Sequence, residues 1–488
     1  RLTTAQPPNI YTSNTVGTHG SCVPIFKYTF ATGFNVSFFN RYRHDYASLL
    51  RLGFPILIGQ LGMIVVGFAD NIMVGHYSTP ALASASFVNN LFNVAIFCCV
   101  GFTYGLTPIV GSLYARGRHG DIGSVTRAAL VLNSMFTVAV MALMSLVYFN
   151  LHRLGQPEEL LPLIRPYFLI YLAGMLPVAV FNVFAQWSYG IKNTNLPMWI
   201  ILSSNLLNII GNYLLIFGHG GFPEMGLVGA GISTLFARVV CPVAIIACFA
   251  IKAHNRPYRR GFARARTSLR DIHRIWSISI PISMQMTFES GSFTFAAVMT
   301  GWISAIDLAA FQIIVIVGTL GFCIYYSIGS AVTILVANEA GRDDRRAMRR
   351  VAWAGYHVLL TLMCISSAIF IFFGNSLMSC FTEDPAVLAI ASGLILPLVL
   401  YQAGDATQIN FAAALRGTAR VMPMLWIAFV SYIVFGIPAT YMLGFPLGLG
   451  TYGIILSFSV SLFIAAALFL YFFLRSTRPV SQLRTGAS

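Results

Sequence analysis

Long apolar stretches follow one another along almost the whole chain. Each runs for about 20 residues or more, the length that a helix needs to cross a hydrocarbon core of about 30 Å. We count twelve, near residues 52–75, 82–111, 128–150, 164–190, 196–217, 226–251, 275–303, 308–338, 351–374, 387–415, 421–444 and 450–474. The pattern predicts an all-α polytopic membrane protein with twelve transmembrane helices.

Composition and charge agree with this class. Hydrophobic residues make up 57% of the chain and charged residues only 9%, whereas soluble domains carry about 25% charged residues. The net charge of +15 does not indicate a nucleic-acid partner, because the basic residues gather in alternate loops. Those loops hold Arg116 and Arg118, then Lys252–Arg274, then Arg342–Arg350, while the opposite loops hold only Arg153 and Arg165. Basic loops stay in the cytoplasm, so we expect both termini there.

The two halves of the chain are duplicates. Four pairs match at one fixed offset: Pro55 with Pro281, Met73 with Met299, Gly75 with Gly301, and Leu82 with Leu308. Each half holds six apolar stretches, an even number, so both halves share one orientation in the membrane. We therefore expect two six-helix lobes related by a pseudo-twofold axis along the membrane normal.

The duplication also predicts the domains. We expect an N-terminal tail at 1–45, an N-lobe at 46–251, a basic cytoplasmic linker at 252–274, a C-lobe at 275–475 and a C-terminal tail at 476–488. The N-terminal tail carries no targeting pattern and is expected to be mobile.

Three carboxylates lie well inside the apolar stretches: Asp70, Glu289 and Asp405. An ionised carboxylate at the centre of a membrane helix costs about 2.5 to 3.5 kcal/mol, so such residues usually bind an ion, a proton or a cationic ligand. By the repeat offset Asp70 matches Ala296 and Glu289 matches Met63. Each lobe therefore has its acid in a different place, and the pattern indicates ion-coupled transport.

Polar neighbours accompany the two acids of the second half. Two helical faces carry them: Tyr401, Asp405 and Gln408 on one, and Gln285, Glu289 and Ser292 on the other. Residues three and four apart share a helix face, and a rise of about 1.5 Å per residue gives Glu289 and Tyr401 similar depths. We expect these oxygen atoms to converge as a site for Na⁺ or for a proton. No other cofactor is expected.

A second polar group lies in the first half. Asn205, Asn208 and Asn212 form a polar stripe, and Asn212 lies at a depth close to that of Asp70, so a second polar pocket is feasible. Amide side chains in membrane helices often serve only to join helices, and both interpretations stay open. Met286 and Phe288, beside Glu289, are most often packing residues, although they would suit a flat apolar cation.

Three sequence runs together resemble the multidrug and toxic compound extrusion (MATE) family, in particular its NorM-like branch of bacterial cation-coupled efflux pumps. They are Gln60–Gly75 (QLGMIVVGFADNIMVG), Gln285–Gly291 (QMTFESG) and Tyr401–Gln408 (YQAGDATQ). The resemblance covers nearly everything from Arg41 to Arg475. Asn71 departs from it, because many relatives look to have threonine there.

The resemblance implies roles for individual residues. Asp70, Glu289 and Asp405 match the family's three membrane-embedded acids, Tyr401 matches a tyrosine near its cation site, and Asn208 and Asn212 match amides around its N-lobe acid. Ion coupling is therefore expected at these six residues, with Glu289, Asp405 and Tyr401 as a candidate Na⁺ site. Substrate contact is expected at Asp70, Gln285, Met286, Phe288 and Gln408.

The resulting prediction is a monomeric antiporter in a bacterial inner membrane that exports cationic, amphipathic drugs or dyes by alternating access. A lipid-linked oligosaccharide flippase is the first alternative, but it would need a cationic central cavity, and apart from Arg238 no Lys or Arg is expected deep in a span. An intramembrane enzyme is disfavoured because no buried His, Cys or Ser group suggests a nucleophile or a metal site. A channel is disfavoured because no short re-entrant pore segment is visible.

Overall fold

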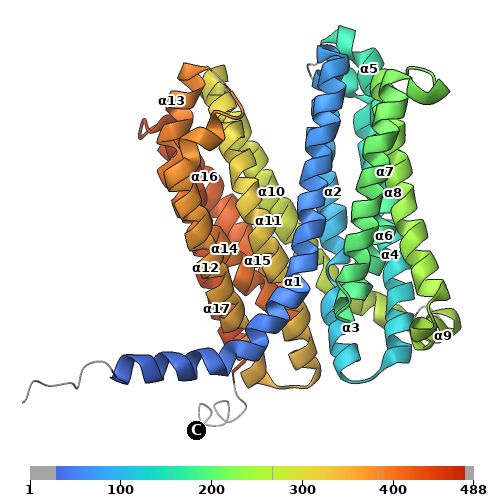
Figure 1. Ribbon diagram of the computed structural model, residues 1–488, viewed down its shortest axis with the longest axis vertical. Coiled ribbons are helices and arrows are strands. Elements are labelled where there is room, and N and C mark those ends of the chain that lie inside the picture. Colours follow the sequence, from blue (N-terminus) through green and yellow to red (C-terminus); the bar gives the residue numbers. More distant parts are fainter. Residues whose placement is uncertain (1–28, 154, 156, 266–267, 383, 479–488) are drawn as a thin grey trace, which may run out of the picture. The chain divides into compact units, whose positions relative to one another are not determined.

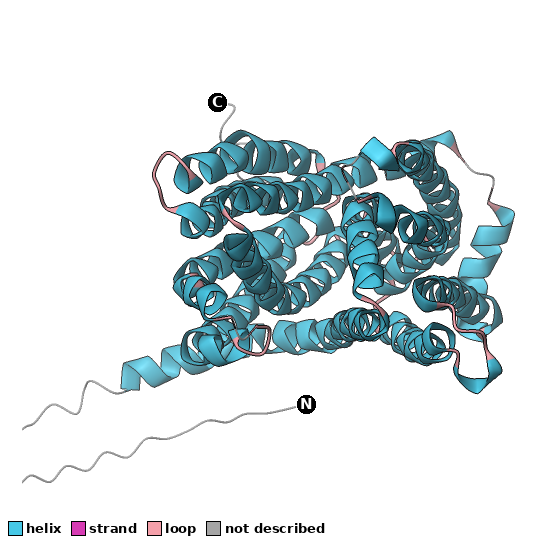
Figure 2. Cartoon of the chain, turned by 90° about the horizontal axis from the view of Figure 1, so that it is seen from above, coloured by secondary structure: helices cyan, strands magenta, loops and turns pink. Residues whose placement is uncertain are grey.

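The computed structural model describes residues 29–153, 155, 157–265, 268–382 and 384–478. The chain divides into two units, residues 1–44 and residues 45–488. In the first unit the described residues begin helix α1 at Thr29. Most of the predicted N-terminal tail and most of the C-terminal tail lie outside the described residues. Seen from above, the described chain consists of helices and loops (Figure 2).

The first half of the chain forms eight helices and three short 3₁₀ turns. They are α1 (Thr29–Tyr77), α2 (Thr79–Thr103), α3 (Leu106–Ala115), α4 (His119–Phe149), η1 (Leu151–Arg153), η2 (Glu158–Leu160), α5 (Leu161–Ala173), α6 (Met175–Gly190), α7 (Asn195–Phe217), η3 (His219–Gly221) and α8 (Gly226–Ile251). Helices α2 and α3 together make one span, as do α5 and α6.

The second half repeats this order with local differences. It comprises η4 (Ala253–Asn255), α9 (Arg256–Arg264), α10 (Leu269–Ile303), α11 (Ala305–Gly341), α12 (Arg345–Met378), α13 (Pro385–Gly393), α14 (Ile395–Gly417), α15 (Met422–Ala428), the π-helical segment η5 (Phe429–Gly436), α16 (Ile437–Gly444) and α17 (Gly450–Ser476). The fourth span is broken in both halves, between α5 and α6 and between α13 and α14, where the bend is 46°.

The described helices supply twelve spans. Ten are long and apolar enough to cross a membrane, and the bent pair α13 and α14 makes an eleventh. Helix α10 is the twelfth. It is 35 residues long, but it carries Gln285, Glu289 and several Ser and Thr residues, which make it more polar than the others. The first six spans, blue to green in Figure 1, and the last six, yellow to red, form two bundles, as the hydropathy pattern and the repeat predict.

Each lobe has its own core. In the N-lobe Phe92 and Phe168 are fully buried and meet edge to face at 4.7 Å between ring centroids. In the C-lobe Phe311, Leu398 and Phe458 belong to a separate buried cluster. Two cores allow each lobe to stay folded while the contact between the lobes changes.

The lobes meet along α2 with α10 and along α3 with α11. Ser283 Oγ donates to the Cys98 carbonyl oxygen at 2.7 Å, and Arg116 Nε donates to the Gly341 carbonyl oxygen at 2.9 Å. At Gly341 the backbones approach so closely that a Cβ there would lie 2.5 Å from the Ser112 carbonyl oxygen. A glycine is therefore required for this α3–α11 contact.

The predicted basic linker is largely structured. Its helix α9 packs against α4 and carries the buried Tyr258, whose ring lies edge to face with Trp187 at 5.7 Å and with His119 at 5.6 Å. Helix α10 begins at Leu269, inside the range predicted for the linker. The side chain of Ser268 caps this helix by accepting a hydrogen bond from the Arg270 backbone N–H.

Candidate functional site

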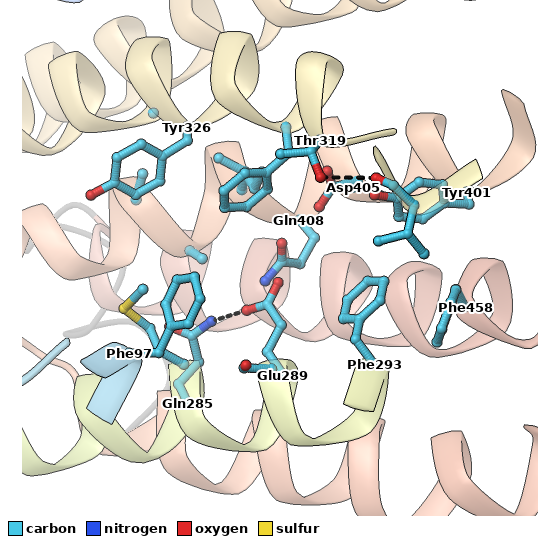
Figure 3. Close-up of a pocket in the computed structure, with 18 of the residues that line it drawn as sticks. Phe97, Gln285, Glu289, Phe293, Thr319, Tyr326, Tyr401, Asp405, Gln408 and Phe458 are labelled. Carbon is cyan, nitrogen blue, oxygen red and sulfur yellow. Dashed lines mark hydrogen bonds between the residues drawn. The ribbon is translucent and has the colours of Figure 1, made fainter. Parts of the chain in front are cut away.

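A cavity of about 220 Å³ lies among α10, α11, α14 and α17 of the C-lobe, with α2 of the N-lobe on one side. The polar residues predicted from the sequence meet there. Gln285, Glu289, Tyr401, Asp405 and Gln408 all line the cavity, and Figure 3 shows Gln285 and Glu289 on one helix with Gln408 close to the Glu289 carboxylate. Two helices far apart in the chain thus bring both carboxylates to one space.

Helical spacing orients Glu289. Its Oε2 atom accepts a hydrogen bond of 2.6 Å from Nε2 of Gln285, which lies one turn earlier on α10. The Gln285 side chain is 2% exposed, so this amide is held in place by packing. The carboxylate thus lines the cavity with one of its oxygen atoms already hydrogen-bonded.

The second carboxylate, Asp405, lies deep inside the protein. It is 3% exposed, and its Oδ2 atom is buried without a hydrogen-bond partner. The Oε1 atoms of Gln408 and Gln285 are likewise buried and unpartnered. Buried polar atoms are nearly always hydrogen-bonded, and oxygen atoms are the ligands of hard cations. This set of acceptors can therefore receive a cation or a proton.

Helix α14, which carries Asp405, is fixed against α11 by a buried network. The Tyr325 hydroxyl donates to Gln402 Oε1 at 2.5 Å and lies 2.7 Å from Ser366 Oγ. Both Tyr325 and Gln402 are completely buried. The network sets the rotation of α14 and thus the direction in which Asp405 points.

Aromatic rings form one wall of the cavity, about one helical turn from the two carboxylates (Figure 3). Phe293 packs on Phe458 at 4.3 Å between ring centroids, and Tyr401 lies 6.2 Å from each of them. Phe322 and Met286 add further apolar surface. A carboxylate pair beside aromatic rings suits a ligand that is both cationic and apolar, since a cation is attracted to the face of such rings.

The segment η5 brings one further polar group to Glu289. Tyr432 lies in this π-helical segment, is 2% exposed, and has a hydroxyl without a hydrogen-bond partner that interacts electrostatically with Glu289. Irregular π-helical turns are often found at functional sites. The sequence analysis did not single out Tyr432.

The structure corrects the expectation about buried basic residues. Arg416 lines the same cavity as Glu289, and its Nε atom is buried without a partner. Its guanidinium lies 5.5 Å from the ring centroid of Tyr104 in the N-lobe. Arg416 stands at the end of an apolar stretch, where we expect a residue at the cytoplasmic surface. In the structure α3 and α6 pack against Arg416 and enclose its guanidinium. By contrast, Arg238 lies 4.0 Å from the ring centroid of Tyr171, consistent with a packing role.

A separate polar cluster surrounds Asp70 in the N-lobe. Asn212 Nδ2 donates to Asp70 Oδ1 at 2.5 Å. With its amide in the alternative orientation, Asn208 also donates to Asp70 Oδ1, at 2.9 Å, and accepts from the Thr234 backbone N–H. The third predicted amide, Asn205, has a buried Nδ2 atom without a hydrogen-bond partner. Asp70 therefore lies with Asn208 and Asn212, and not in the C-lobe cavity.

The predicted substrate residues divide between several places. Gln285, Met286 and Gln408 line the C-lobe cavity. Phe288 is not among the lining residues; it packs against the C-lobe core with its ring 6.1 Å from that of Phe429. The direction of the Phe288 side chain depends on how α10 is rotated about its axis, and the spacing of aromatic residues alone did not determine that rotation.

Several lining residues escaped the sequence analysis. Asn93 and Phe97 come from α2 of the other lobe, and Thr319 and Tyr326 come from α11. None of them stands near an intramembrane carboxylate in the sequence. Polarity within an apolar stretch could have drawn attention to Asn93, Thr319 and Tyr326, but many structural residues share it, and Phe97 has no such signal.

Comparison with known proteins gives independent evidence about the family to which this chain belongs. The MatE family model matches residues 55–214 and 281–442, which begin at the same two prolines that start the internal repeat. A protein of Geobacillus kaustophilus named "Probable multidrug resistance protein NorM" is 28% identical over 88% of this chain and 94% of its own length. The "Multidrug resistance protein NorM" of Vibrio cholerae is 26% identical over the same shares.

Solved structures agree in fold. The crystal structure of the eukaryotic MATE transporter AtDTX14 superposes with a TM-score of 0.81 over 90% of this chain and 98% of that one, at 17% identity. The matched family segments cover more than half of the chain. The chain therefore belongs to the MatE family of membrane transporters.

Proposed function

We propose that this protein is a cation-coupled exporter of cationic, amphipathic small molecules. The observation that carries the proposal is the C-lobe cavity, which Glu289 and Asp405 line together with a wall of aromatic rings, and in which three buried oxygen atoms lack hydrogen-bond partners. The names of the NorM relatives, which describe multidrug resistance proteins, support the same class of substrate. Na⁺ or a proton would be the coupling ion at Glu289, Asp405 and Tyr401.

Coupling requires the ion and the drug to act on one conformational equilibrium. A ligand shifts such an equilibrium only through its different affinity for the two states. An ion bound between α10 and α14 would change their separation, and with it the space left for a drug between Met286 and the aromatic wall. The Asp70 cluster would provide a second titratable group on the N-lobe side.

The distribution of basic residues supports a proposal for which side of the protein faces the cytoplasm and for the membrane in which it lies. Arg116 and Gly341 meet beside the basic loops, which we assign to the cytoplasm of a bacterial cell. In this proposed orientation the α3–α11 contact closes the cytoplasmic side, which supports an outward-facing state for this structure in the inner membrane. A duplicated chain contains both lobes and can act as a monomer.

The proposal is tested with purified protein in liposomes loaded with a fluorescent cationic dye. We expect an imposed Na⁺ gradient, a proton gradient or both to drive the dye against its own gradient, whereas liposomes without a cation gradient only equilibrate. Protein-free liposomes serve as the control. Equal dye movement with and without each gradient would contradict ion coupling.

Arg416 favours one alternative, a flippase for lipids with an anionic pyrophosphate headgroup. It places a guanidinium in a cavity where the sequence predicted no Lys or Arg. The two carboxylates outnumber it and would repel such a headgroup. Absence of dye movement under every gradient, from folded protein that translocates a lipid-linked pyrophosphate in the same liposomes, would put this alternative first.

A further prediction concerns the Asp70 cluster. In Asn212→Leu, Asp70 loses the donor at 2.5 Å, and a hydrogen bond to a charged group contributes roughly 1.5 to 3 kcal/mol. We expect a lower unfolding temperature and slower gradient-driven efflux. Asn205→Leu on the same helix is the matched control, because its amide nitrogen has no partner to lose. Equal effects in both variants would show that the hydrogen bond to Asp70 contributes nothing specific to stability or to efflux.

A further inference from the structure

A second large cavity lies at the surface of the C-lobe, away from the carboxylate pair. Its volume is about 510 Å³. It is formed where α14 and α17 end and where α12 and α15 begin. The lining residues are Arg345, Leu415, Arg420, Pro423, Phe472, Arg475, Ser476 and Arg478. We call this the four-arginine pocket.

Backbone carbonyl groups hold two of the arginines in place. Arg345 Nη1 donates to the Arg478 carbonyl oxygen at 2.6 Å, and Arg420 Nη1 donates to the Ser476 carbonyl oxygen at 3.2 Å. Both bonds join neighbouring helices to the end of α17. A guanidinium has five N–H donors, so each of these arginines keeps donors for a ligand.

Among the residues that the structure describes, no carboxylate lines the pocket. Within the described part of the chain, ion pairs join Arg118 to Asp121, Arg342 to Glu339 and Arg350 to Asp45, and none includes a pocket arginine. Four guanidinium groups around one space repel each other. A ligand with negative charge would relieve this repulsion, and planar guanidinium groups match phosphate oxygens in pairs.

The rim of the pocket is apolar on its membrane side. Pro423 and Phe472 line the pocket. On the same helix as Pro423, Met422 is 60% exposed and Trp426 is 64% exposed. Tryptophan is enriched where a membrane protein passes from headgroups to acyl chains. The surface thus offers a cationic hollow and an adjoining apolar strip.

We propose that the four-arginine pocket binds the phosphate of an anionic phospholipid, with an acyl chain lying along Pro423, Trp426 and Phe472. A soluble phosphate shares the charge but would leave the apolar strip uncovered. Basic pockets between membrane helices commonly receive such headgroups on the cytoplasmic side. This site is independent of the carboxylate pair and of the drug and ion proposed to bind there.

Native mass spectrometry of the whole protein, titrated with phosphatidylglycerol, tests the proposal. We expect the native protein to retain one phosphatidylglycerol that the double variant Arg420→Gln/Arg475→Gln binds about thirtyfold more weakly, since each basic residue at an anionic membrane surface contributes roughly fivefold. The single variant Arg475→Gln, whose side chain has no hydrogen bond to the protein among the described residues, should lose roughly fivefold.

Two controls make the result specific. The double variant Arg256→Gln/Arg260→Gln removes the same charge from exposed positions on α9 and should keep the lipid. Phosphatidylcholine should show no difference between native protein and variants. Equal retention by native protein and Arg475→Gln, or an equal loss in the α9 variant, would overturn the proposal. Inorganic phosphate that binds through the same arginines, with no preference for phosphatidylglycerol, would overturn the lipid assignment.

Discussion

Replacing either acid of the C-lobe cavity, as Glu289→Gln or Asp405→Asn, is expected to abolish gradient-driven efflux while the protein still folds. The amides keep the shape of the side chains but cannot carry the charge that a cation or a proton neutralises. An ionised carboxylate inside the membrane costs about 2.5 to 3.5 kcal/mol. If the variant loses a binding free energy of the same size, its affinity for the ion falls roughly a hundredfold. Efflux from liposomes under each gradient measures the effect.

Stability distinguishes lost coupling from misfolding. Asp405 is 3% exposed and its Oδ2 atom has no donor. Removing an uncompensated buried charge does not destabilise a protein, so Asp405→Asn should unfold at the same temperature as the native protein or above it. Glu339→Gln is the control. Among the described residues this carboxylate forms an ion pair with Arg342, which directly follows α11, and its replacement should leave efflux unchanged. Full gradient-driven efflux by both cavity variants would refute the assignment.

The second large effect is expected at the α3–α11 contact. In Gly341→Ala the new methyl group would lie 2.5 Å from the Ser112 carbonyl oxygen and 2.9 Å from the Ala115 Cβ. Overpacking of this kind costs typically 1 to 3 kcal/mol. Because separating the lobes relieves the clash, we expect the population to shift about tenfold or more toward the state in which α3 and α11 are apart.

Spin labels report this shift directly. Labels at Arg118 and Asp343, on opposite sides of the contact, should show longer distances in Gly341→Ala, measured in a background without the exposed Cys364 and Cys380. Gly291→Ala is the matched control, because a Cβ there meets nothing within 4 Å. Its distances and its efflux should equal those of the native protein. Unchanged distances in Gly341→Ala would show that this contact does not limit the opening of the lobes.

Much of the architecture could be predicted because it depends on composition and local geometry. A membrane interior admits helices of a set length, so hydropathy located the spans. Local irregularities were not visible. The break at Tyr104 between α2 and α3, and the π-helical segment Phe429–Gly436, have no counterpart at the matching positions of the other half. An internal repeat cannot reveal such features, because they occur in one half alone.

The acids of the candidate site were recognisable because a carboxylate in lipid is costly wherever it lies. Their neighbours were predictable only within one helix, where a spacing of three or four residues places Gln285 beside Glu289. The same rule predicted Ser292 on that face, but Ser290 lines the cavity and Ser292 does not. Spacing alone does not say which residues of a helix turn to a cavity. Phe288 therefore contacts Phe429, although it adjoins Glu289 in the chain.

By itself, the sequence determined the class of protein, the duplicated lobes and the three costly carboxylates, because each follows from the free energy of placing a residue in lipid. Only the tertiary structure decided which side chains meet across helices. It brought Phe97 from the N-lobe to the C-lobe cavity and enclosed Arg416 beside Tyr104. Such contacts depend on how helices rotate and pack against one another, and residues that are distant along the chain carry no local signal of it.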